Sequence, residues 1–327
     1  MESEPTRNLA LDLVRVTEAA ALSAGRQMGR GDLAGADRAA VEAMRLVLNS
    51  IPMNAVIVIG EGEKDRAPML FNGEHVGTGQ GIEMDIAVDP VDGTRLLANG
   101  NWNAIATVAL APRGTMFFPG PTFYMEKIAV GPESRGKVDL QAPVAENLAA
   151  VAHARGKRIE DLTVIILDRP RHTQLIAEVR RAGARIRLIP DGDVAGALMT
   201  CWPDSGIDVL YGIGGTPEGV LAACAVRAMG GEIQGRLHAR DEDELRRGRQ
   251  QGYDYTRVLR LDDLVASEDV FFAATGITDG ELLDGVKYTG SSARTDSLVV
   301  RGLTGTVREI IATHRLDRLD QLSTIKY

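Results

Sequence analysis

The sequence predicts an α/β protein with a parallel sheet in its second half. Short β-branched runs that end in glycine or aspartate, such as AVIVIG at 55–60 and TVIILD at 163–168, are typical of buried strands. After about residue 160 such runs alternate with segments of helical periodicity, as in RHTQLIAEVRRAG at 171–183. This alternation favours βαβ units.

The elements divide into two groups on either side of a loop-rich stretch, PESRGKVDLQAP. Before it we expect helices at 8–28 and 36–50 and strands at 55–60, 82–89, 103–112 and 123–131. After it come a helix at 144–156, strands at 163–168, 184–193, 207–215 and 269–280, helices at 171–183, 193–201 and 217–231, a charged surface helix at 241–252, a hairpin at 286–302 and a helix at 305–314. We therefore predict an N-terminal metal- and phosphate-binding α+β domain at 1–150 and a C-terminal α/β sugar-binding domain at 151–327.

Composition excludes several classes of function. The chain of 327 residues has a net charge of −8, which argues against nucleic acid or an anionic membrane as the main partner. No apolar run reaches the roughly 18 residues of a membrane span, and the N-terminus does not resemble a signal peptide. Two cysteines form neither a disulfide framework nor a zinc pattern, so we expect a cytoplasmic protein.

Three predicted strands end in acidic residues. Glu61 lies in GEGE at 60–63, Asp89 and Asp92 lie in DPVDGT at 89–94, and Glu218 follows the strand at 207–215. Ligands of open α/β sheets bind at the carboxyl ends of strands, and clustered carboxylates need a cation. Oxygen ligands suit Mg²⁺ or Mn²⁺ rather than zinc. Taken alone, GEGE is equally well explained as a solvated acidic turn.

The DPVDGT segment is the most specific of these signals. Gly93 permits close backbone approach, and Thr94 opens a helix whose N–H groups favour a phosphate. The plainer alternative is an Asp-Pro turn with an aspartate cap. The orientation of Arg95 stays open, and Asp85, within the same strand, is expected to be a structural carboxylate.

Asp37 is a further candidate ligand in the second helix. Its spacing places it on the same face as Val41, Met44 and Leu48. An acid in the first turn is more often a cap that favours the helix dipole, but this position on the apolar face favours a buried ligand.

Several motifs extend along the chain beside these acids. They are VIGEGE (58–63), APMLFNGEHVG (67–77), DPVDGT (89–94), YMEKIAVGP (124–132), PRH (170–172), IPDGDVA (189–195), YGIGGTPEG (211–219) and ATGIT (274–278). Together they resemble the class II, GlpX-type fructose-1,6-bisphosphatases, which belong to the lithium-sensitive, metal-dependent sugar and inositol phosphatases. The resemblance covers about residues 8–316.

The resemblance implies a layered α/β/α/β/α sugar-phosphatase fold with mixed and parallel sheets. It implies hydrolysis of the 1-phosphate of fructose 1,6-bisphosphate with Mg²⁺ or Mn²⁺, inhibition by lithium, and a role in gluconeogenesis and glycerol metabolism. The implied metal ligands are Asp37, Glu61, Asp89, Asp92 and Glu218, and the implied catalytic residues are Thr94, Asp92 and Glu61. The implied substrate-binding residues are Asp92, Gly93, Thr94, Tyr124, Arg169, Pro170, Arg171, Asp191, Gly192, Asp193 and Gly215.

Two positions depart from the pattern of the family. Asp92 stands where some members have glutamate, and Leu33 stands where some have lysine, so no phosphate contact is expected from Leu33.

Other interpretations remain for individual residues. Arg169 and Arg171 suit a second phosphate but also fit a solvated basic turn, and Asp193 fits a helix cap. Tyr124 and Lys127 lie three apart on a strand and face opposite sides, and the resemblance favours Tyr124 for the site. His172 is expected to be structural.

Two other functions remain open. One is phosphatase action on another sugar bisphosphate, such as sedoheptulose 1,7-bisphosphate. The other is a sugar-phosphate-binding module without catalysis, which would not need five carboxylates. A homo-oligomer, either a dimer or a tetramer, is also expected.

Overall fold

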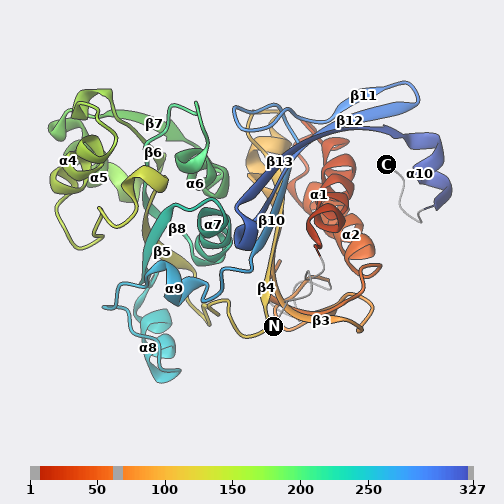
Figure 1. Ribbon diagram of the computed structural model, residues 1–327, viewed down its shortest axis with the longest axis horizontal. Helices are drawn as coiled ribbons and strands as arrows, with labels where there is room; N and C mark the ends of the chain where they lie inside the picture. The colour runs from red at the N-terminus through yellow and green to blue at the C-terminus, as the bar shows by residue number, and fades with distance from the viewer. Residues whose placement is uncertain (1–7, 62–68, 323–327) are drawn as a thin grey trace.

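The computed structural model describes residues 8–61 and 69–322 and arranges them in five alternating layers of helices and sheets (Figure 1). Two outer helical layers enclose two sheets, and a third helical layer lies between the sheets. The expected layered α/β/α/β/α architecture with mixed sheets is therefore confirmed.

The larger sheet has eight strands within the described residues and draws them from both ends of the chain. β1 and β3 are parallel, and β4, β10 and β12 extend the sheet through antiparallel pairs. The strands are β1 (Met53–Ile59), β2 (His75–Val76), β3 (Ile82–Asp92), β4 (Ile105–Pro112), β10 (Phe271–Gly276), β11 (Lys287–Thr289), β12 (Ser292–Arg301) and β13 (Thr306–Arg315).

The smaller sheet has the strand order β7-β6-β8-β5-β9. β6 is parallel to β7 and β8, and β5 is antiparallel to β8 and β9. The strands are β5 (Tyr124–Val130), β6 (Thr163–Leu167), β7 (Arg185–Ile189), β8 (Val209–Gly215) and β9 (Glu232–His238).

Six helices build the three helical layers. α1 (Ala10–Gly25) and α2 (Leu33–Leu48) cover the larger sheet, and α4 (Val144–Ala154) and α5 (Thr173–Ala182) cover the smaller one. α6 (Asp193–Cys201) and α7 (Thr216–Ala228) lie between the sheets, which explains why nearly every residue of α7 is buried. Among the described residues, three hydrophobic clusters fill the gaps between helices and sheets, and one of them fills the gaps on both sides of α6 and α7.

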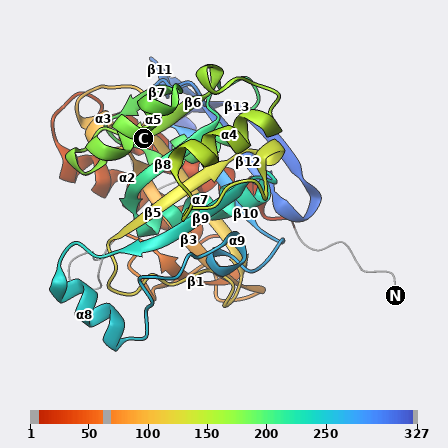
Figure 2. The ribbon, with the colours of Figure 1, turned by 90° about the vertical axis from the view of Figure 1, so that its left-hand side faces the viewer.

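The remaining short elements lie at the ends of strands or outside the layers. They are α3 (Thr94–Ala98), α8 (Glu242–Gln250), α9 (Leu261–Leu264), α10 (Leu316–Leu322) and the 3-10 turns η1 (Pro132–Ser134), η2 (Ile159–Asp161), η3 (Pro170–His172) and η4 (Gly302–Thr304). Figure 2 shows the charged helix α8 extending away from the layered body, as its composition predicts. No helix in the described part of the chain is long and apolar enough to span a membrane.

Sheet membership does not follow the predicted division at residue 150. β5 lies before that point but joins the smaller sheet, and β10–β13 lie after it but complete the larger sheet. The domains at 1–150 and 151–327 therefore stay a prediction. Each sheet contains strands from both sides of residue 150.

The prediction of a helix at 305–314 is wrong, because Thr306–Arg315 forms β13 and pairs with β12 along its whole length. The β-branched residues Val307, Ile310 and Ile311 favour a strand. Both faces of this edge strand are partly exposed, so the segment lacks the apolar alternation that marks a half-buried strand. No element was predicted at Glu232–His238, where the structure has β9.

Candidate active site

The DPVDGT segment forms the end of β3 and the start of α3. β3 continues through Pro90 to Asp92, and its register against β4 shifts between Asp89 and Asp92. Such a bulge bends a strand and re-aims its side chains. Gly93 then adopts a φ of +92°, in the left-handed region that favours glycine, and turns the chain into α3.

Thr94 and Asp37 meet at this turn, although 57 residues separate them. The Thr94 Oγ1 hydroxyl lies 3.0 Å from Asp37 Oδ1, to which it donates, and 3.2 Å from the Val91 carbonyl oxygen. The cap of α2 is Asp32, whose side chain accepts from the Gly35 N–H, so the alternative reading of Asp37 as a cap is wrong. Burial raises the pKa of Asp37, and the Thr94 hydrogen bond opposes this rise.

The other acidic strand ends converge on the same place. Burial raises the pKa of Asp89 well above its usual range, and the charge of Asp92 raises it further. The charges of Glu61 and Glu218 also act on Asp89. Loss of hydration, and then the charges of Asp37 and Glu218, raise the pKa of Glu61 to about 7. Charge effects therefore connect the five predicted ligands in a chain: Asp37 acts on Glu61, Glu61 and Asp92 act on Asp89, and Glu218 acts on Glu61, Asp89 and Asp92. Gly62 and Glu63 lie outside the described residues.

Asp92 and Glu218 link this cluster to the helices between the sheets. The Ala195 N–H of α6 donates to Asp92 Oδ2 at 3.1 Å. Burial raises the pKa of Asp92 well above its usual range, and the charge of Asp193 adds to this effect. Glu218 Oε2 is buried and accepts no hydrogen bond in the described structure. Its carboxylate lies against the Gly215 Cα, where any Cβ would collide with it.

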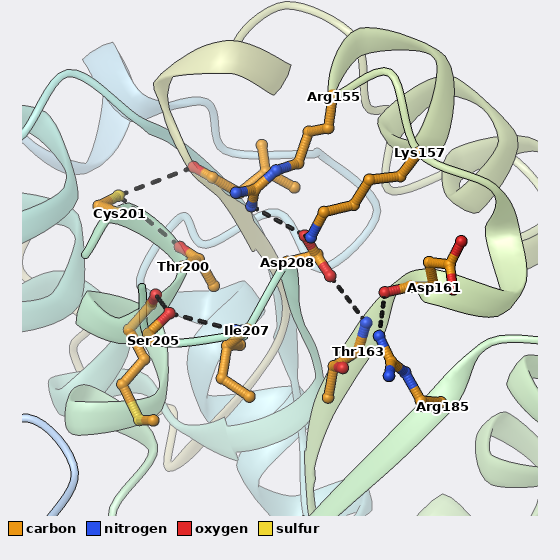
Figure 3. Close-up of polar contacts among 12 residues, drawn as sticks. Arg155, Lys157, Asp161, Thr163, Arg185, Thr200, Cys201, Ser205, Ile207 and Asp208 are labelled. Carbon is orange, nitrogen blue, oxygen red and sulfur yellow. Dashed lines mark hydrogen bonds and ion pairs between the residues drawn. The ribbon is translucent and has the colours of Figure 1, made fainter. Parts of the chain in front are cut away.

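Two other buried carboxylates, Asp208 and Asp85, have partners that compensate their charge. Asp208 is 1% exposed, and it pairs with Arg155 at 2.9 Å and with Lys157 at 2.6 Å while accepting from the Thr163 N–H (Figure 3). Asp85 confirms the expected structural role, because its Oδ2 accepts three backbone N–H groups from residues 114–116. The candidate site instead gathers more acidic than basic side chains.

The excess of negative charge indicates that these residues fit a divalent cation. In residues 8–61 and 69–322, no group of three or more acidic, histidine or cysteine side chains is already arranged to hold a metal ion. The orphaned Glu218 oxygen and the mutually raised carboxyl pKa values nevertheless fit a hard cation, because both features follow from missing positive charge. The donor set, all oxygen, is the one that Mg²⁺ and Mn²⁺ prefer.

A second group of polar residues borders the acids on the side of the smaller sheet. Arg169 Nη2 lies 3.7 Å from Asp191 Oδ1, and Gly192, with a φ of +84°, joins Asp191 to α6. Burial raises the pKa of Asp191, and the charges of Arg169 and Arg95 oppose this rise. Arg95 is thus exposed and close enough to act on Asp191, which answers the question of its orientation.

The two arginines that are predicted to bind a phosphate make different contacts. The guanidinium of Arg171 lies 4.6 Å from the centre of the Tyr124 ring and donates to the Ile213 carbonyl oxygen, whereas Arg169 faces Asp191. Pro170 begins the turn η3 that separates them. Both charges therefore lie at the rim and remain partly exposed.

His172 confirms its expected structural role. Its buried ring accepts a hydrogen bond from the Ile213 N–H at Nε2 and contacts the Leu167 carbonyl oxygen through Nδ1. Burial lowers the pKa of this imidazole.

Lys127 is the residue that sequence reasoning missed. Its side chain is 2% exposed, and its Nζ lies 2.6 Å from Asp193 Oδ2. Asp193 begins α6 but makes no cap hydrogen bond, so its alternative reading as a cap is also wrong. A lysine between Met125 and Ala129, on the buried face of an apolar strand, was the available signal.

Comparisons with known proteins agree with this site. A family model described as bacterial fructose-1,6-bisphosphatase, glpX-encoded, matches residues 7–314. The chain is 50% identical over 327 residues to fructose-1,6-bisphosphatase 1 class 2 of Escherichia coli strain K12, with 96% of this chain and 97% of that protein covered. It is equally similar to fructose-1,6-bisphosphatase class 2 of Shigella flexneri.

A distant likeness exists to the solved structure of extragenic suppressor protein SuhB from Bartonella henselae. The TM-score is 0.31 and the identity 17%, over 60% of this chain and 74% of that one, which is too low to bear on fold or reaction. The family match and the 50% identity over nearly the full length are decisive: the chain belongs to the bacterial glpX-encoded family of fructose-1,6-bisphosphatases.

Proposed function

We propose that this protein hydrolyses the 1-phosphate of fructose 1,6-bisphosphate to fructose 6-phosphate and phosphate, as a gluconeogenic enzyme of the cytoplasm. The observation that carries the proposal is the hydrogen bond from Thr94 to Asp37 beside four further carboxylates whose charges act on one another, in a chain of this family. A binding module without catalysis would have no use for this excess of acids.

Asp37, Glu61, Asp89, Asp92 and Glu218 would hold Mg²⁺ or Mn²⁺, and lithium is expected to inhibit. When bound, such ions neutralise the phosphoryl oxygens, lower the pKa of water and stabilise the leaving alkoxide. The crowding of the acids supports this assignment, since each raises the pKa of its neighbours.

The protein's own catalytic groups are Thr94, Asp92 and Glu61, with Asp37 behind Thr94. Because Thr94 Oγ1 donates its proton to Asp37, its lone pairs are free to accept a hydrogen bond from the attacking water. A hydroxyl alone is too weak a base, so the Asp37 carboxylate is the group behind it that can take up the proton.

The substrate is proposed to extend from Asp92-Gly93-Thr94, which contact the scissile phosphate, to the rim of the smaller sheet. Arg169 and Arg171 would bind the second phosphate, and Asp191 and Asp193 would accept sugar hydroxyls. Tyr124, Pro170, Gly192 and Gly215 would complete the pocket wall.

A substrate panel tests the proposal. Phosphate release would be measured from fructose 1,6-bisphosphate, sedoheptulose 1,7-bisphosphate, fructose 6-phosphate and inositol monophosphate, with Mg²⁺ or Mn²⁺ and with added lithium. We expect fructose 1,6-bisphosphate to give the highest kcat/KM and fructose 6-phosphate to be left intact. A preference for sedoheptulose 1,7-bisphosphate would favour the alternative substrate, and no release from any compound would favour a binding module.

The raised pKa of Glu61 gives a pH-dependent prediction for the metal-free protein. A carboxyl whose pKa rises on folding favours folding only while protonated, so its contribution is lost as pH increases from 4.5 through about 7. Metal-free Glu61→Gln should therefore gain Tm over the wild type between pH 5 and pH 8, by about 1–3 °C because Glu61 is partly exposed.

At pH 8, added Mg²⁺ should make the Tm of the wild type higher than that of Glu61→Gln, because the cation binds the deprotonated carboxylate. The control is Glu18→Gln on α1, since burial also raises the pKa of Glu18 to about 7. Its gain should persist with Mg²⁺. An equal response of both variants to Mg²⁺ in thermal unfolding would contradict the assignment of Glu61.

We also propose that the protein is a homo-oligomer and that β13 pairs with β13 of a second copy. No described residue other than those of β12 pairs with this ten-residue edge strand, and Val307 and Ile311 are 43% and 60% exposed. Two copies pairing antiparallel around a twofold axis can place Arg308 opposite Glu309 twice, which is self-complementary in charge. A cavity of about 720 Å³, lined in part by Trp202, Met229 and Glu309, lies beside the strand.

Ile311→Lys tests this interface, because a lysine on an edge strand opposes pairing. Light scattering after gel filtration should find the wild type as a dimer or tetramer and the variant one step smaller. Leu11→Lys, at an apolar residue of α1 that is 63% exposed, is the control and should leave the assembly unchanged. A wild-type monomer, or an Ile311→Lys variant of unchanged mass, would contradict the proposal.

A further inference from the structure

Lys127 is the buried cation of the candidate site. It lies on β5 with 2% of its side chain exposed, between Asp193 Oδ2 at 2.6 Å and the Gly215 carbonyl oxygen at 3.2 Å. Asp193 in turn is 5% exposed. Burying both charges is costly, and such pairs persist where partners and geometry are fixed.

The neighbouring strand β8 makes room for this ion pair because it ends in two glycines, Gly214 and Gly215. A Cβ on Gly214 would collide with the Asp193 carboxylate and come within 3.0 Å of Lys127 Nζ. A Cβ on Gly215 would collide with the Glu218 carboxylate. Gly214 and Gly215 of YGIGGTPEG thus clear the space that the lysine and the acids occupy.

The charges around Lys127 come from α7, from α6 and from the loop before α6. α7 contributes Glu218, whose raised pKa is opposed by the Lys127 charge. α6 contributes Asp193, and the preceding loop contributes Asp191, both of which act on Glu218 and Asp92. At the rim of the site, the charges of Arg169 and Arg95 oppose the raised pKa of Asp191.

We infer that Lys127 is a positioning residue of the hydrolytic site: its ammonium holds Asp193 in place and offsets negative charge beside Glu218, so that the carboxylates can share divalent cations. The inference rests on the proposed function. Lys127 does so through Asp193 and need not touch the substrate.

Three variants test this inference, Lys127→Met, Lys127→Arg and the neutral pair Lys127→Met/Asp193→Asn. Without the ammonium, the Asp193 carboxylate loses its partner at 2.6 Å and can turn toward Asp92 and Glu218, which disturbs the arrangement of the ligands. Mn²⁺ binding at pH 7 should therefore weaken about tenfold, the lower end of the usual effect of residues that orient metal ligands. The kcat for fructose 1,6-bisphosphate should fall about 100-fold, with a smaller effect in Lys127→Arg. Mn²⁺ binding would be measured by calorimetry on metal-free protein without substrate.

The neutral pair separates the role in the site from a general loss of stability, and it serves if Lys127→Met does not fold. With both charges removed, Mn²⁺ affinity should return to within about threefold of the wild type. KM should be raised, because asparagine replaces one of the Asp193 oxygens, which are proposed to accept sugar hydroxyls, with an NH2 group. Weak Mn²⁺ binding in a folded neutral pair would overturn an action through Asp193.

Lys157→Met is the matched control, because Lys157 Nζ also lies 2.6 Å from a buried aspartate, Asp208, in the remote cluster of Figure 3. It should lower Tm but leave kcat/KM and Mn²⁺ binding unchanged. Wild-type Mn²⁺ affinity and kcat in Lys127→Met would overturn the inference. If the wild type released no phosphate, the proposed function would fail, whereas calorimetry would still test Lys127.

Discussion

Replacing Thr94 by alanine is expected to lower kcat for fructose 1,6-bisphosphate by about 10²–10⁴-fold, the usual contribution of a positioned proton-transfer group. The hydroxyl links the attacking water to the Asp37 carboxylate, and its removal breaks that link. KM should change little, because the hydroxyl supports the transition state more than substrate binding.

Thr94→Ser is the matched control for this variant. Serine keeps the oxygen that donates to Asp37, so it should retain most of the activity. Steady-state kinetics with saturating Mg²⁺ gives both constants. A Thr94→Ala variant with the kcat of the wild type would remove Thr94 from the mechanism.

Replacing Asp89 by asparagine is expected to lower metal-dependent activity at least about 100-fold. It should also raise the Tm of the metal-free protein. Both effects have one cause. Asp89 is crowded by Asp92, Glu61 and Glu218, so neutralising it relieves repulsion while removing a ligand. Stability gained at the expense of function is typical of residues kept for their chemistry.

Calorimetry with Mn²⁺ and thermal unfolding measure the two effects in the same preparation. Asp85→Asn is the control on the same strand. Asp85 accepts three N–H groups and faces Arg113 at 3.4 Å, so this variant should lose stability but keep its Mn²⁺ affinity. Full activity of Asp89→Asn at saturating Mg²⁺ would remove Asp89 from the ligand set.

Local patterns in the sequence predicted most of the helices and strands and the strand ends that carry acids, whereas the layered arrangement was implied by the family resemblance. Asp89 and Asp92 were recognisable because carboxylates at the end of a buried strand need a cation or a hydrogen-bond donor. The structural role of Asp85 followed from its position within a buried strand.

Long-range pairing was not predictable in this way. Nothing local shows that β5 joins strands that follow it by 80 or more residues in the smaller sheet, or that β13 returns to the larger one. Lys127 was missed for the same reason: its partner Asp193 lies 66 positions further along the chain, and strand periodicity only assigned it to the face opposite Tyr124. An amphipathic pattern reports burial, but it does not report which charge a buried lysine meets.

The central claim is that divalent cations bind among the carboxylates beside Thr94. A crystal structure of the protein with Mn²⁺, phased with the anomalous signal of manganese, tests it most directly. The account predicts anomalous peaks about 2 Å from carboxylate oxygens of Asp89, Asp92 and Glu218, within reach of Glu61 and Asp37. Manganese bound elsewhere in the molecule, with these carboxylates left without a metal, would contradict it.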